Sequence, residues 1–161
     1  AQIVAADLIK DKSVKIFKIN ENKNPYVAMG EKETKVVREG KQVHVYMTAI
    51  RSHLTPDNIE GIKMGDEVYF HVTNLEQDWD VPHGFAIKGA ANAELLVMPG
   101  ETVTLKWMPD RVGIFPMYCT DFCSALHQEM SGYVRVSPAG SNVPLLFSTG
   151  TNQPKASAEA K

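Results

Sequence analysis

The segment Glu67-Val-Tyr-Phe-His-Val-Thr-Asn74 alternates two kinds of side chain with a period of two. Successive side chains of a β-strand point to opposite faces, so Val68, Phe70 and Val72 would share one face of such a strand. A Met64-Gly65-Asp66 turn signal precedes the segment. The stretch therefore predicts a β-strand with one face packed against a core.

The same period continues on both sides of this segment. From about residue 41, Val43, Val45 and Met47 alternate with polar or aromatic residues. Further strands are expected over residues 80–87, 102–107, 113–118 and 132–136. Gly, Pro and Asn punctuate these segments and no segment shows a convincing helical period, which favours an all-β fold built as an antiparallel sandwich or barrel.

The ends of the chain follow the pattern less clearly. We expect residues 1–40 to form an N-terminal arm with an edge strand near 14–19, and residues 41–137 to form the central domain. Residues 138–161 are expected to be a partly flexible extension in which 143–147 can dock. Helix is expected to be minor, with one turn within 121–128, and 56–62 is expected to be a loop or short helical turn.

The overall charge excludes several classes of partner. Seventeen Lys and Arg residues against nineteen Asp and Glu give a net charge of −2, which provides neither a basic stripe for nucleic acid nor a polybasic membrane anchor. The apolar runs are far shorter than the roughly 20 residues that span a bilayer. A protein or small-molecule partner is expected. The chain begins at Ala1 without a signal-like segment, as expected of a mature secreted form or an excised domain.

The two cysteines lie in the segment Cys119-Thr-Asp-Phe-Cys123-Ser-Ala-Leu-His127-Gln-Glu-Met130, between two expected strands. The cysteine pair alone would also suit a structural disulfide or a redox switch. The added imidazole and thioether are soft ligands that favour copper or zinc, and Met beside Cys and His is typical of copper electron-transfer sites. Structural zinc sites use Cys and His instead.

A second histidine is needed for a copper site, and His83 in Pro82-His83-Gly84-Phe85 is the best candidate. A mononuclear blue-copper site uses one cysteine, so the other would be left over. A site in which two thiolates bridge two copper ions would use both cysteines. It would leave the weak ligand positions for Met130 and a backbone carbonyl. The other histidines (His44, His53 and His71) are expected to be exposed or hydrogen-bonded rather than ligands.

The pattern Cys-x3-Cys-x3-His-x2-Met with an upstream His-Gly-Phe resembles the CuA site shared by nitrous-oxide reductase and cytochrome oxidase subunit II. The strings at 80–85 and 64–68 resemble the reductase branch more closely, and the resemblance covers about residues 40–137. It implies a cupredoxin-like Greek-key β-sandwich. The metal ligands that it implies are His83, Cys119, the backbone carbonyl of Asp121, Cys123, His127 and Met130.

In that resemblance both cysteines bridge the two coppers, His83 and Met130 serve one ion, and His127 serves the other. Many reductases have Trp at the position of Asp121 and His at that of Ser124. The change at Asp121 is tolerated, because the ligand at this position is the backbone carbonyl and not the side chain. Every side-chain ligand of the pattern is present.

The resemblance implies electron transfer through a mixed-valence copper pair in the periplasm. The expected donor is a cytochrome c or a small cupredoxin, and the expected acceptor is the catalytic domain of a nitrous-oxide reductase homodimer. This chain would carry no catalytic residues, because its five histidines are fewer than the seven that the family's catalytic copper site needs. The alternatives are an oxidase subunit II domain and a copper carrier or thiol-redox protein.

Overall fold

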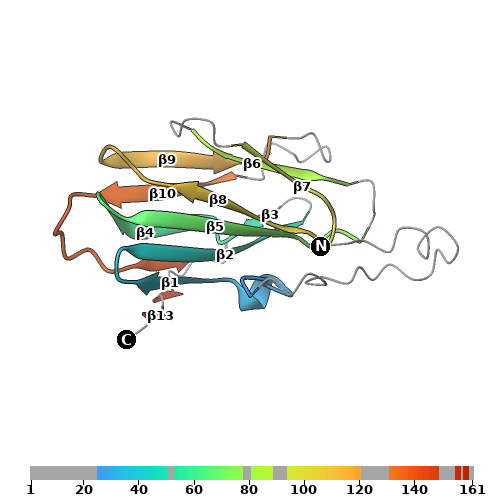
Figure 1. Cartoon of the computed structure of the whole chain (residues 1–161), viewed down its shortest axis with the longest axis horizontal. Helices are drawn as coiled ribbons and strands as arrows, with labels where there is room; N and C mark the ends of the chain where they lie inside the picture. Colours follow the sequence, from blue (N-terminus) through green and yellow to red (C-terminus); the bar gives the residue numbers. More distant parts are fainter. Residues whose placement is uncertain are drawn as a thin grey trace, which may run out of the picture.

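The computed structural model describes residues 25–50, 53–77, 81–88, 94–120, 131–148, 155–156 and 158–159. These residues form two β-sheets that pack face to face around one hydrophobic core (Figure 1). The expected cupredoxin-like β-sandwich is confirmed. No helix in these ranges is long and apolar enough to cross a membrane.

The first sheet has the order β13-β1-β2-β5-β8, with β3 paired beside β2. Its strands are β1 (Lys35–Glu39), β2 (Gln42–Ile50), β3 (His53–Thr55), β5 (Glu67–Asn74), β8 (Thr102–Trp107) and β13 (Ala158–Glu159). A short 3-10 turn, η1 (Glu31–Glu33), precedes β1.

The second sheet has the order β12-β11-β4-β10-β9-β6-β7. Its strands are β4 (Asn58–Lys63), β6 (His83–Ile87), β7 (Glu94–Val97), β9 (Gly113–Tyr118), β10 (Ser131–Ser137), β11 (Leu146–Ser148) and β12 (Lys155–Ala156). Strands β9 and β10 lie side by side in Figure 1 and pair antiparallel.

The expectation of purely antiparallel pairing is wrong, because the sheets are mixed. Strands β2 and β5 pair in parallel, as do β4 and β10. Parallel neighbours need a crossover connection, and the chain supplies one by placing β4 in the opposite sheet between β2 and β5.

The expectation of a loop or helical turn at 56–62 is also wrong, since residues 58–62 belong to β4. Ile59 and Ile62 of β4 are buried, but Gly61 lies between them with φ +92, so the simple alternation of a strand is lost. The docking expected for 143–147 is confirmed, because Leu145 and Phe147 are buried and β11 pairs with β4. The edge strand at 14–19 and the turn at 121–128 lie outside the described residues.

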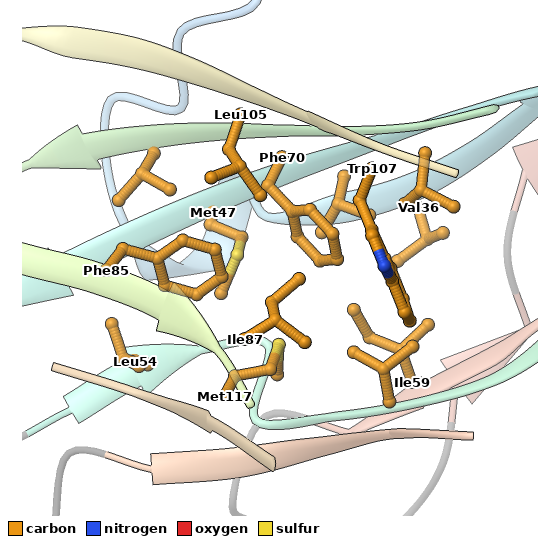
Figure 2. Close-up of a cluster of buried hydrophobic side chains, with 14 of the residues drawn as sticks. Val36, Met47, Leu54, Ile59, Phe70, Phe85, Ile87, Leu105, Trp107 and Met117 are labelled. Carbon is orange, nitrogen blue, oxygen red and sulfur yellow. The ribbon is translucent and has the colours of Figure 1, made fainter. Parts of the chain in front are cut away.

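Aromatic rings from both sheets meet in the core. Phe70 of β5 lies 5.4 Å from Phe85 of β6, centroid to centroid, and Trp107 of β8 lies 5.2 Å from Phe115 of β9 in an edge-on contact. Figure 2 shows Phe70, Phe85 and Trp107 directed into the space between the sheets. Burying such side chains is the main stabilising contribution to a sandwich of this kind.

The methionines divide between core and surface. Met47 is buried in the core. Met29, Met98 and Met108 are exposed. All three lie outside the strands, where the alternating pattern gives no information about burial.

Gly132, in the second position of β10, has no room for a side chain. A Cβ atom added there would lie 1.8 Å from the backbone oxygen of Asp57, which accepts the amide of Tyr133 at 2.7 Å. Gly132→Ala should therefore push β10 away from the adjoining backbone and lower the free energy of unfolding by about 1–3 kcal/mol. Urea unfolding measures this loss.

Gly30→Ala is the matched control, because its backbone is extended and its Cβ would meet nothing within 4 Å. We expect the control to change stability by less than about 0.5 kcal/mol. Equal stability of the two variants would contradict the close approach at Gly132.

Candidate metal centre

His83 is the first residue of β6 and is fully buried, with 0% of its surface exposed. Strand β6 pairs antiparallel with β9, with Ala86 opposite Tyr118. In an antiparallel pair the start of one strand lies beside the end of the other. His83 is therefore held at the end of β9 where Cys119 follows.

The structure brings His83 and Cys119 together, although they are 36 residues apart in sequence. The Nδ1 atom of His83 lies 3.8 Å from the Sγ atom of Cys119, and the cysteine is 4% exposed. Protein metal bonds are about 2.0 Å to imidazole nitrogen and about 2.3 Å to thiolate sulfur, so two such donors on one ion can be at most about 4.3 Å apart. The observed separation fits two ligands of a shared metal, and the donor types suit copper.

The other predicted ligands lie in the connection between β9 and β10. Asp121, Cys123, His127 and Met130 are outside the described residues. Tyr118 at the end of β9 pairs with Ser131 at the start of β10, so this connection begins and ends beside the His83 and Cys119 contact. In the part of the chain that the structure describes, no three His, Cys, Asp or Glu side chains form a metal-binding group.

Glu76 is a buried member of the site that the sequence analysis did not single out. Its carboxylate oxygen Oε1 lies 3.1 Å from Nε2 of His83, and Glu76 is only 4% exposed. An acidic residue just after a strand is usually exposed at the surface. The sequence feature that could have identified Glu76 is its position in the short link between β5 and the His-Gly-Phe string.

Apolar residues two positions from His83 and from Cys119 are buried in the core. Phe85 of β6 and Met117 of β9 are fully buried and belong to the core cluster, as expected of residues that limit water access to a metal site.

His44 and His71 form a separate pair on the first sheet. The Nδ1 atom of His44 lies 2.8 Å from Nε2 of His71, and the Nδ1 atom of His71 lies 2.7 Å from the hydroxyl of Thr104. The ring of Tyr26 stacks on His71 at 4.0 Å and on His44 at 4.9 Å. These histidines are hydrogen-bonded, within the sequence expectation, while His53 is exposed.

Burial governs the ionisation of this pair. Burial, and secondly the neighbouring His44, lower the pKa of His71 from 6.5 to about 3. Burial also lowers the pKa of His44, opposed by the negative charge of Glu39. Both rings are therefore neutral near pH 7 and are held as hydrogen-bonded packing groups of the sheet.

Comparisons with known proteins identify the family of this chain. No protein-family model matches the chain. The nitrous-oxide reductase of Stutzerimonas stutzeri is 35% identical over 122 residues, and that of Ralstonia nicotianae is 39% identical over 106 residues. Subunit 2 of the cytochrome c oxidase of Thermus thermophilus is 34% identical over 102 residues, which are 63% of this chain and 71% of that subunit. The chain belongs to the CuA cupredoxin family.

A solved structure supports the fold of this CuA domain. A heme-copper terminal oxidase dimer solved by cryo-EM contains a chain that matches with a TM-score of 0.58 and 20% identity, over 83% of this chain and 87% of that one. The match to the reductases covers 71% of this chain for Stutzerimonas and 66% for Ralstonia. The chain spans only 19% and 16% of the length of those two reductases. These relatives support a CuA-type copper electron-transfer domain.

Proposed function

We propose that this chain passes single electrons through a dinuclear copper centre and delivers them to the catalytic copper site of nitrous-oxide reductase. The observation that carries the proposal is the buried contact between His83 Nδ1 and Cys119 Sγ at 3.8 Å. It brings an imidazole from β6 and a thiol that directly follows β9 together at the base of the connection whose sequence contains the remaining soft donors. The identity of up to 39% to reductases supports the choice of acceptor.

The proposed ligands follow from the donor chemistry of that connection. They are His83, Cys119, the backbone carbonyl of Asp121, Cys123, His127 and Met130. Both cysteine sulfurs would bridge the two ions, since one thiolate cannot supply a two-sulfur bridge. Copper held by these residues would supply the one-electron redox chemistry of the site.

The chain's own residues keep the site rigid and dry. His83 is held in β6, which pairs with β7 and β9, and Cys119 directly follows β9, while β10 holds the other end of the ligand-bearing connection. Phe85 and Met117, two positions from His83 and Cys119, are fully buried, and a buried apolar shell of this kind would limit water access. A site that moves little between its two redox states loses little energy to reorganisation, so transfer is fast.

The proposed partners lie outside this chain. A cytochrome c or a small cupredoxin would donate the electron in the periplasm, and the catalytic domain of a homodimeric reductase would accept it. Reduction of nitrous oxide would take place on that domain, because the family's catalytic copper site needs seven histidines and this chain has five.

An oxidase is the second candidate acceptor. The chain covers 71% of the Thermus oxidase subunit 2, compared with 19% of the Stutzerimonas reductase. A stopped-flow experiment distinguishes the two acceptors. The reduced, copper-loaded chain is mixed with a reductase catalytic domain or with an oxidase lacking its subunit 2, and its rate of oxidation is measured. Faster oxidation by the reductase domain supports the proposal, and faster oxidation by the oxidase favours the second candidate.

The copper centre itself is tested by metal analysis and electron paramagnetic resonance of the oxidised, copper-loaded chain. We expect two coppers per chain and a seven-line hyperfine pattern, because one unpaired electron is shared by two equivalent nuclei. One copper with a four-line pattern would show a mononuclear site and would leave the second cysteine to another role.

A further inference from the structure

Glu76 is an acidic side chain in a place where an unpaired charge is costly. It is 4% exposed, and an ionised carboxylate in such surroundings requires hydrogen-bond donors. One donor is the Nε2–H group of His83, 3.1 Å from Oε1 of Glu76. The burial of Glu76 is therefore coupled to the orientation of the His83 ring.

This hydrogen bond fixes which nitrogen of His83 carries the proton. A carboxylate only accepts hydrogen bonds, so Nε2 of His83 must donate. In the neutral ring Nδ1 then carries the lone pair, and Nδ1 is the atom that faces Cys119 Sγ at 3.8 Å. The nitrogen directed toward the thiol is the one able to bind a metal.

Asn74 holds Glu76 in place. Its side-chain oxygen accepts the backbone amide of Glu76 at 2.8 Å, and its side-chain nitrogen donates to the backbone oxygens of Val81 and Val97 at 3.0 Å and 2.9 Å. Val97 is the cross-strand partner of His83. A single buried amide thus joins the end of β5, the link that contains Glu76, and the strand beside His83.

We propose that Glu76 is a positioning residue of the copper centre, which selects the Nε2–H tautomer of His83 and aims Nδ1 at the site beside Cys119. The inference rests on the proposed copper-binding function. Glu76 itself would form no bond to copper and would act through His83. Carboxylates in this position raise the basicity of a ligating histidine and fix its ring.

The tautomer can be measured without copper. Nitrogen NMR of the copper-free chain should show His83 protonated at Nε2 and unprotonated at Nδ1. Protonation at Nδ1 instead would overturn the proposal. This result does not depend on whether the chain binds one copper, two or none, so it separates a failure of this inference from a failure of the proposed function.

The metal-loaded test uses two replacements of the same residue. Glu76→Leu fills a similar volume without an acceptor, and should weaken copper binding by about 10–100-fold and change the hyperfine splitting. Glu76→Gln keeps an oxygen that can accept from Nε2–H, and should restore both affinity and spectrum. An unchanged Glu76→Leu spectrum, in a wild type that binds two coppers, would overturn the positioning role.

Thr73→Val is the matched control for loss of a buried hydrogen bond. Thr73 is fully buried on the first sheet and bonds the hydroxyl of Thr102 at 2.7 Å, and valine keeps its shape. The control should lower stability modestly and leave the copper spectrum unchanged. If it changes the spectrum as Glu76→Leu does, the effect is general loosening of the fold and the proposal fails.

Discussion

Cys119→Ser should abolish the dinuclear copper centre. The thiol of Cys119 is buried 3.8 Å from Nδ1 of His83, and serine offers a hydroxyl that binds copper poorly. The one remaining thiolate, from Cys123, cannot form a bridge of two sulfurs. We expect at most one copper per chain and loss of the seven-line pattern, measured by metal analysis and electron paramagnetic resonance.

The control for this variant is Thr120→Val, a shape-conserving change in the neighbouring residue. The Thr120 hydroxyl has no hydrogen-bond partner among the described residues, so its removal should leave copper content and spectrum as in the wild type. Unfolding of both variants in their copper-free form shows whether each is folded. A folded Cys119→Ser protein that still binds two coppers with the wild-type spectrum would rule out the bridging role of this cysteine.

The strands with regular alternation could be predicted from the sequence with correct bounds. The segments Glu67–Asn74, Thr102–Trp107 and Gly113–Tyr118 are strands over the ranges expected, because one face of each packs on the core and the other does not. Strand β4 could not be predicted in this way. Its pairing with β10 shifts register near Val134, so its buried residues do not follow a period of two.

Pairing direction also depends on information that periodicity does not contain. The same alternation fits a parallel or an antiparallel neighbour, and the parallel pair β2 and β5 arises from the passage of the chain through the other sheet. The short strands β7 and β11 have too few residues to show a period.

The site was predictable to the extent that its chemistry is carried by rare residues. Cys119 and His83 were proposed as ligands from residue type and spacing, and the structure places them in contact, while their role as ligands remains a prediction. Glu76 could not be identified in this way, because carboxylates are common in the sequence and only its burial in the structure distinguishes this one. The pairing of His44 with His71 is likewise set by the parallel register of β2 and β5.

Acid should destabilise the folded chain through the His44 and His71 pair. In the folded state the pKa of His71 is lowered from 6.5 to about 3, so the unfolded chain takes up a proton that the folded chain resists. Stability from this group is fully present above about pH 6.5 and falls as the pH is lowered toward 3. By pH 4 the loss should be about 3 kcal/mol from His71 alone, measured by urea unfolding of the copper-free protein.

His71→Phe isolates this contribution, because phenylalanine keeps a flat ring beneath Tyr26 and cannot take up a proton. It also loses the hydrogen bonds to His44 and Thr104, which should cost about 1 kcal/mol each at neutral pH. Below pH 6.5 the variant should lose stability less steeply than the wild type. His53→Ala removes an exposed histidine and should follow the wild-type profile. Parallel profiles of the wild type and His71→Phe would contradict the role of His71, because contributions from groups that both proteins share cancel in the difference.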